Sequence, residues 1–135
     1  MNKGELFFRS LVKSLEAEKI TSSLDLENSR RDIKIPVEFN SKGELVVANL
    51  VFKVEANLDN FSQVVSESVE VFPNKFRKED EKTSMEMDSF LYKMRLTEEQ
   101  VDEFEQMRVE LRKKIMFGKR ELNNLRKSVA SPIEE

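Results

Sequence analysis

The chain lacks the side chains that carry most acid–base and nucleophilic work in enzymes. It has no cysteine and no histidine among its 135 residues, which excludes disulfides, thiolate nucleophiles, zinc–thiolate sites and imidazole chemistry. Carboxylates, lysine, arginine, hydroxyls and one tyrosine, Tyr92, remain. Some metal-dependent enzymes use only carboxylates, but the composition favours a non-catalytic protein without a cofactor.

Glycine is scarce, and long apolar runs are absent from the sequence. The three glycines, Gly4, Gly43 and Gly118, are too far apart to build a phosphate-binding loop or a nucleophile elbow. No apolar stretch reaches the roughly 18 residues that a membrane-spanning helix needs. Residues 1–9 do not have the pattern of a secretory signal. We therefore expect a cytoplasmic protein that does not bind a membrane.

The chain is rich in charge and has enough apolar residues for one core. Charged residues make up 36% and hydrophobic residues 39%, including ten phenylalanines, which is typical of a folded domain with a well-solvated surface. A chain of this length buries about two thirds of its unfolded surface in a single domain. A second domain is not expected.

An amphipathic helix is predicted at the N-terminus, over residues 4–15. Its apolar side chains recur three and four residues apart, so they lie on one helical face. The polar segment 20–32 that follows is expected to be a connector that holds a short strand at most. The apolar face consists of Phe7, Phe8, Leu11, Val12 and Leu15.

A two-residue period then predicts three strands, over residues 33–39, 44–57 and 61–72. Their connections are too short for a parallel crossover, so they should form an antiparallel meander. Pro36 cannot donate to a ladder, so the first strand should lie at an edge or turn this position outward. The second strand is apolar on both faces at its start, which predicts cover on both sides there.

Residues 74–84 are dominated by charge and are expected to form a flexible loop. After this loop, residues 90–96 alternate in a way that favours a fourth strand, with helix as the competing interpretation. The acidic cluster from Glu79 to Asp88 has no central glycine of the kind that calcium loops need, so no metal is expected there.

The motif Asp32-Ile33-Lys34 gives the weakest functional hypothesis. It is similar to the acid-x-lysine element of some metal-dependent nucleases, but three residues match by chance in almost any charged sequence. No companion aspartate lies on a convincing neighbouring strand. A small carboxylate-based metal enzyme is therefore the third alternative.

A long amphipathic helix is predicted over residues 98–128. Thr97 and Gln100 have the spacing of a capping box, and apolar positions then repeat in a heptad pattern. Such a helix would be about 45 Å long, more than a small domain can cover. It should therefore break near Gly118 or project and find a partner.

The predicted fold class is α+β. It comprises an antiparallel meander of three to four strands, the N-terminal amphipathic helix and the long C-terminal helix. Residues 1–97 should form the core, residues 98–128 a helical arm of the same domain, and residues 129–135 a disordered tail.

Charge is segregated along the chain. Residues 108–127 contain eight basic and two acidic residues, whereas residues 1–107 contain fifteen basic and twenty-two acidic residues. An acidic start and a basic end also suit the dipole of a single helix, so this pattern does not by itself require a partner. It is also compatible with antiparallel pairing of two copies and, in third place, with binding of phosphates.

The main functional hypothesis is a non-catalytic protein–protein interaction module, such as an adaptor, regulator, inhibitor or assembly component. It would bind another protein or itself through the apolar seam of the last helix. The seam residues are Val101, Phe104, Arg108, Leu111, Ile115, Leu122 and Leu125. The alternative is a nucleic-acid-binding module that uses Arg112, Lys113, Lys119, Arg120, Arg126 and Lys127.

Overall fold

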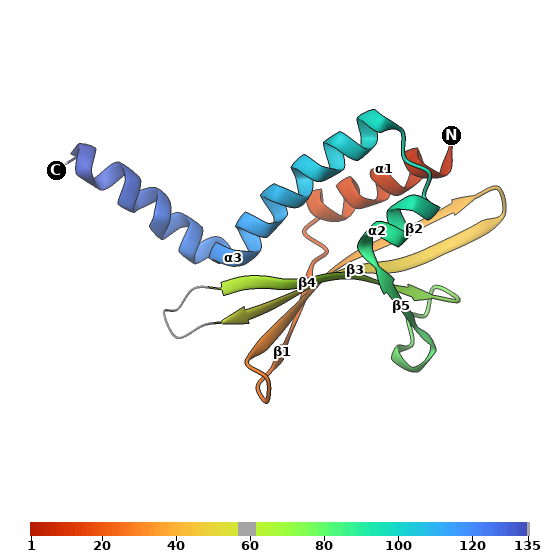
Figure 1. The fold of residues 1–135 in the computed structure, drawn as a ribbon, viewed down its shortest axis with the longest axis horizontal. Coiled ribbons are helices and arrows are strands. Elements are labelled where there is room, and N and C mark those ends of the chain that lie inside the picture. Colours follow the sequence, from red (N-terminus) through yellow and green to blue (C-terminus); the bar gives the residue numbers. More distant parts are fainter. Residues whose placement is uncertain (57–61, 135) are drawn as a thin grey trace.

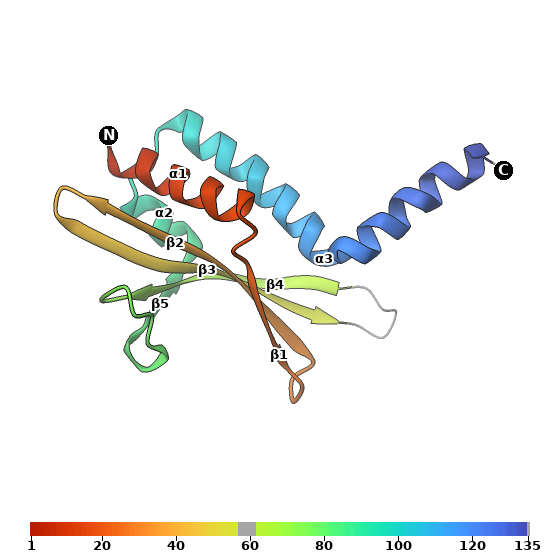
Figure 2. The same cartoon turned by 180° about the vertical axis from the view of Figure 1, so that it is seen from behind.

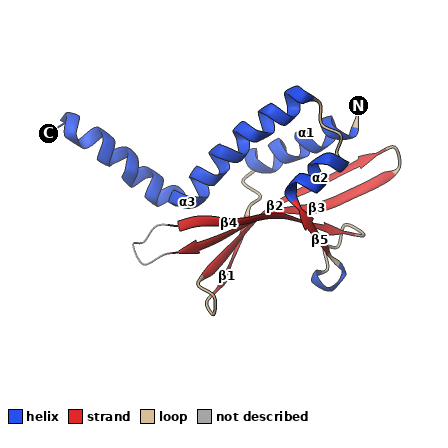
Figure 3. Ribbon diagram, in the orientation of Figure 1, coloured by secondary structure: helices blue, strands red, loops and turns tan. Residues whose placement is uncertain are grey.

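The fold is a β-sheet with helices on one side (Figures 1 and 3). The computed structural model describes the backbone of residues 1–56 and 62–134 and the side chains of residues 1–55 and 63–116. Within that part of the chain, five antiparallel strands follow one another in the sheet in chain order. The elements are α1 (Lys3–Glu16), β1 (Thr21–Asp25), β2 (Arg30–Ser41), β3 (Glu44–Ala56), β4 (Ser62–Phe72), the 3-10 turn η1 (Glu79–Glu81), β5 (Thr83–Glu86), α2 (Met87–Lys93) and α3 (Glu98–Glu134).

The α+β class and the antiparallel meander are confirmed, but the sheet has five strands instead of three or four. Two short edge strands account for the difference. β1 lies in the segment 20–32, which the sequence predicts to be a connector. β5 begins inside the segment 74–84, which the sequence predicts to be a loop. The strand predicted over residues 90–96 is wrong, because α2 occupies most of it.

Burial explains why α2 is a helix. Met87, Phe90 and Met94 lie three and four residues apart and are all buried. Tyr92, which a two-residue period would place on the same face as Phe90, is 86% exposed. The apolar residues therefore follow the helical period, and the competing interpretation of this segment is correct.

The hairpin between β2 and β3 follows the turn chemistry of its sequence. Lys42 and Gly43 have positive φ values of 52° and 83°, which a two-residue hairpin turn of this kind requires. The Gly43 amide donates to Asn40 Oδ1 over 3.1 Å. Gly43 tolerates this backbone conformation without a steric penalty.

The position of Pro36 agrees with the sequence prediction. β1 pairs only with residues Arg30–Lys34 of β2, so from Pro36 onward the outer edge of β2 has no strand beside it in the described chain. A proline there costs no ladder hydrogen bond. α1 packs over this part of β2 (Figure 2).

Three phenylalanines, one from each helix, form the centre of the core. Phe7 of α1 meets the ring of Phe90 of α2 at 5.6 Å and that of Phe104 of α3 at 5.8 Å, measured between centroids. Each is at most 1% exposed. Burying one such side chain contributes about 1.5–3 kcal/mol, so this contact fixes all three helices on the sheet.

α1 lies close to the start of α3 because residue 4 has no side chain. A Cβ atom at Gly4 would lie 2.9 Å from Gln100 Oε1 and 3.2 Å from the carbonyl oxygen of Arg95. Asn2 caps the start of α1, and its side chain accepts from the Glu5 amide over 2.8 Å.

α3 is helical over all 37 residues from Glu98 to Glu134, including Gly118 and residues 129–134 of the predicted tail; residue 135 lies outside the described residues. At 1.5 Å per residue it would measure about 55 Å if straight. Figures 1 and 2 show that it changes direction partway along, after lying beside α1 and over the sheet. Its C-terminal part, here called the arm (residues 117–134), then runs away from the rest of the domain.

Candidate functional site

The first turn of α3 is fixed by the predicted capping box. The Gln100 amide donates to Thr97 Oγ1 over 3.2 Å, and the Thr97 amide donates to Gln100 Oε1 over 3.0 Å. Both bonds satisfy amides that a helix start leaves free. The direction in which α3 crosses the domain is therefore set at its first residues.

The inner face of α3 packs against its own domain. Phe104 is fully buried, Leu111 is 6% exposed, and Ile115 is partly buried against the same core. These members of the predicted seam are thus covered within the chain. Leu122 and Leu125 lie on the arm, outside the residues whose side chains the structure describes.

Arg108, also a seam residue, is paired instead of forming an apolar contact. Its Nε donates to Glu67 Oε1 on β4 over 3.1 Å, and its Nη1 contacts Glu105 and Asp88 at 3.0 and 3.2 Å. Burial lowers the pKa of the guanidinium, but the hydrogen bond and the charge of Glu67, with the other carboxylates, outweigh this and raise the pKa overall. The charge of Arg108 therefore helps to hold α3 on the sheet.

Arg112 completes this cluster by binding the second oxygen of Glu67, with 2.6 Å between Nη2 and Oε2. Glu67 has the same strand phase as Val69, whose side chain is buried in the core, so its carboxylate lies on the helix-covered face. The sequence contained a signal for this pair. A carboxylate on an apolar strand face and an arginine in an apolar helical seam each need a partner of opposite charge.

The outer face of α3 is exposed along its first three turns. We call it the outer stripe, and its members are spaced three or four residues apart. Val101 and Val109 are 41% and 45% exposed, although both are apolar. The outer stripe consists of Glu98, Val101, Asp102, Glu105 and Val109, all exposed.

The predicted phosphate-binding cations are divided between two environments. Arg112 is bound to Glu67, and the ammonium of Lys113 lies 3.5 Å from Glu110 on the surface. The other four belong to the arm, so the structure does not describe their side chains. They are Lys119, Arg120, Arg126 and Lys127.

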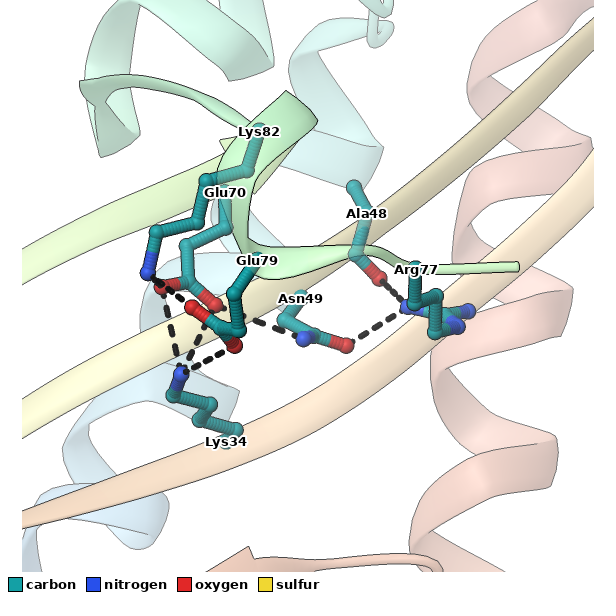
Figure 4. A network of polar contacts seen from close by, with 7 residues as sticks. All are labelled: Lys34, Ala48, Asn49, Glu70, Arg77, Glu79 and Lys82. Carbon is teal, nitrogen blue, oxygen red and sulfur yellow. Dashed lines mark hydrogen bonds and ion pairs between the residues drawn. The ribbon is translucent and has the colours of Figure 1, made fainter. Parts of the chain in front are cut away.

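The opposite face of the sheet carries a polar network that sequence reasoning missed (Figure 4). Glu70 of β4 is 6% exposed and accepts from Lys82 over 2.6 Å, from Lys34 over 3.2 Å and from Asn49 over 3.4 Å. Burial raises the pKa of Glu70, but these hydrogen bonds outweigh it and hold the pKa below its usual value. The carboxylate therefore stays ionised although it is buried.

The network explains what the segment 74–84 does. Arg77 donates from Nη1 to the Ala48 carbonyl over 2.7 Å and lies above the Phe72 ring, 5.9 Å from its centroid. Through Arg77 and Lys82 the segment is held against the sheet, where the sequence suggests a flexible loop. The cover predicted for the second face of β3 is found at Val47 and Val51, which are at most 2% exposed, but not at Leu45, which is 43% exposed.

The described residues offer no arrangement for metal chemistry or for crossing a membrane. No group of three or more acidic side chains among them is placed to hold a metal ion, and no helix among them is long and apolar enough to span a bilayer. In the Asp32-Ile33-Lys34 motif, the lysine contacts Glu70 and Glu79.

A search of protein-family models, curated proteins and solved structures found no match to this chain. Function is therefore inferred from the chemistry of the chain itself. α3 is the element whose course most needs a functional explanation, because its first half packs on the domain and its second half extends away from it.

Proposed function

We propose that this protein is a non-catalytic interaction module that associates with a second copy of itself. In this arrangement the arm of one copy lies antiparallel on the outer stripe of the other. The observation that carries the proposal is the course of α3, which leaves the domain while its apolar heptad pattern continues in the sequence (Figures 1 and 2).

The apolar part of the contact comes from the continuation of the seam. Where α3 crosses the sheet, the seam buries Phe104 and Leu111. The same spacing continues on the arm with Leu122, Leu125 and Val129. An isolated helix of this length is marginal in water, so cover on this side would stabilise it.

Charge supports a second copy as the occupant. The outer stripe presents the carboxylates of Glu98 and Asp102 around its two exposed valines, together with Glu105, which also pairs with Arg108. The arm carries four cations and one internal carboxylate, Glu121. An antiparallel arrangement places the basic arm beside the acidic stripe and sets the orientation of the pair.

Two-fold symmetry doubles this contact. Each copy has one arm and one outer stripe, so a closed dimer would form the same interface twice. The arm is about 27 Å long at 1.5 Å per residue, which exceeds the length of the outer stripe. One arm is therefore long enough to cover the whole outer stripe of the other copy.

Nucleic acid is the weaker candidate for the basic arm. A row of cations attracts phosphates by releasing their counterions, and this binding falls steeply as salt rises. Against it, Arg112 is bound to Glu67, and the acidic outer stripe of the same helix would repel a polyanion.

The experiment is a sedimentation or light-scattering measurement of mass on the full chain. We expect a mass twice the 15.8 kDa of one chain for the wild type, and 15.8 kDa for Leu122→Asp. Leu111→Asp would be a poor test because Leu111 is 6% exposed and its loss would damage the core. The matched control is Asn124→Asp, which adds the same charge about 200° around the helix and should stay dimeric.

Three results would overturn the proposal. They are a monomeric wild type at every concentration, an unchanged mass for Leu122→Asp, and equal dissociation of the Asn124→Asp control. Addition of an oligonucleotide to a monomeric wild type, with salt-dependent complex formation, would favour the nucleic-acid candidate.

A further inference from the structure

A shallow cleft of about 220 Å³ lies where α1 passes the free edge of β2. Its walls come from α1, the turn after it, β2 beyond Pro36, and the segment between β4 and β5. None of its described lining residues belongs to α3. Whatever binds there is thus independent of the proposed self-association.

Two serine hydroxyls of α1 line one side of the cleft, and both already form hydrogen bonds within the protein. Ser10 Oγ donates to the Glu38 carbonyl over 3.0 Å and accepts from the Glu38 amide over 2.9 Å. Ser14 Oγ donates to the Pro36 carbonyl over 2.6 Å. These bonds satisfy the edge of β2, so the charged side chains are the groups left to meet a ligand.

Positive charge is in excess around the cleft. Lys13, Lys19 and Arg77 line it, together with one carboxylate, Glu38. In the described part of the chain, neither lysine side chain has an ion pair or a hydrogen bond. Among the described residues, Arg77 has an ion pair only with Glu38, with 4.0 Å between Nη2 and Oε1.

Arg77 is held in place by neutral acceptors. Nη1 donates to the Ala48 carbonyl and to Asn49 Oδ1, and Nη2 donates to the Val37 carbonyl over 3.2 Å. A guanidinium has five N–H groups, so the Nε proton and one on Nη2 have no acceptor among the described residues. Burial lowers the pKa of Arg77, partly offset by Glu38, which also indicates a charge that its surroundings compensate incompletely.

We propose that this cleft binds a small phosphate monoester. A phosphate dianion has three terminal oxygens that accept from different directions, which suits cations supplied by a helix, a turn and a distant segment. A carboxylate would offer one charge and two oxygens in one plane. Glu38 is placed to accept from a hydroxyl of the esterified group, and the small volume excludes a large ligand.

The test is an NMR titration of the ¹⁵N-labelled full chain with inorganic phosphate and with glycerol phosphate, at an ionic strength held constant with sodium chloride. Saturable shifts are expected at the backbone amides around Ser10, Lys13, Lys19 and Glu38. Glycerol phosphate should bind more tightly than inorganic phosphate because its carbon-bound hydroxyls extend beyond the phosphate group toward Glu38, whereas the hydroxyl of inorganic phosphate is held on phosphorus itself.

Variants separate a built site from general charge attraction. Lys13→Ala/Lys19→Ala leaves the carbonyl contacts of Arg77 intact and should weaken binding about tenfold or more. Lys93→Ala/Lys114→Ala removes two exposed lysines elsewhere and should change nothing. Shifts that do not saturate, shifts outside the cleft, equal weakening in the two variants, or glycerol phosphate binding no tighter than phosphate would each overturn the proposal.

Discussion

On one face of the sheet, α1, α2 and α3 each contribute a buried phenylalanine, and these rings contact one another above β2, β3 and β4. On the other face, the segment between β4 and β5 contributes Arg77, Glu79 and Lys82 to a network centred on Glu70 (Figure 4). The first kind of cover gains stability from apolar area. The polar network is stable only where each buried charge is paired with an opposite charge, so its stability depends on the geometry of these contacts and on pH.

The largest effect is expected on the helix-covered face. Phe104→Ala should lower the free energy of unfolding by about 3–5 kcal/mol, because it leaves a cavity among three helices. Gln106→Ala, at an exposed position of the same helix outside the outer stripe, should change it by less than about 0.5 kcal/mol. Urea unfolding of both variants makes the comparison. Similar losses for the two would mean that α3 does not pack on the sheet through Phe104.

A smaller effect, dependent on pH, is expected on the opposite face. Glu70→Gln removes the charge that Lys34 and Lys82 pair with and should cost about 1–2 kcal/mol near neutral pH. The folded pKa of Glu70 lies below the ordinary glutamate value of 4.5. Its ionic stabilisation is therefore complete above that value and is lost as the pH falls through the folded pKa.

The measurement is urea unfolding of wild type and Glu70→Gln from about pH 7 down to about pH 3. The difference between the two proteins should shrink toward the acidic end. Glu81→Gln serves as the control, since Glu81 is exposed and has no ion pair in the described chain. A difference that stays constant with pH would show that Glu70 acts through its shape alone.

The smallest effect is expected where an ion pair is open to water. Lys3 Nζ lies 3.3 Å from Glu44 Oε1, with the two side chains 24% and 66% exposed. Lys3→Ala should therefore change the free energy of unfolding by less than about 0.5 kcal/mol. A thermal melt that showed a loss as large as that of Glu70→Gln would mean that burial is not what distinguishes the two pairs.

Local sequence was sufficient for the elements whose signals lie within a few residues. Thr97 and Gln100 form the predicted capping box, and Lys42 and Gly43 form the turn in the short antiparallel connection predicted between residues 33–39 and 44–57. These structures depend on backbone amides and φ angles close by in the chain. The same reasoning failed at α2, because a few alternating residues are compatible with either a strand or a short helix. Only the burial of Phe90 and Met94 in the structure identifies the helix.

Candidate site residues were harder to foresee, because their partners are distant in sequence. Lys34 and Glu70 are 36 residues apart, and Arg108 and Glu67 are 41 apart. The composition of residues 74–84 therefore suggested a flexible loop, although Arg77 and Lys82 hold this segment on the sheet. The sequence does not indicate which residue a charged side chain will contact, because these contacts form only once the strands are paired.

By itself, the sequence determined that the chain is α+β, that its sheet is antiparallel, and that one side of the last helix is apolar, because periodicity reports which side chains share a face. Only the tertiary structure decided what covers each face. Phe104 and Leu111 are buried in their own domain, and the arm continues past it, because the sheet ends before the helix does.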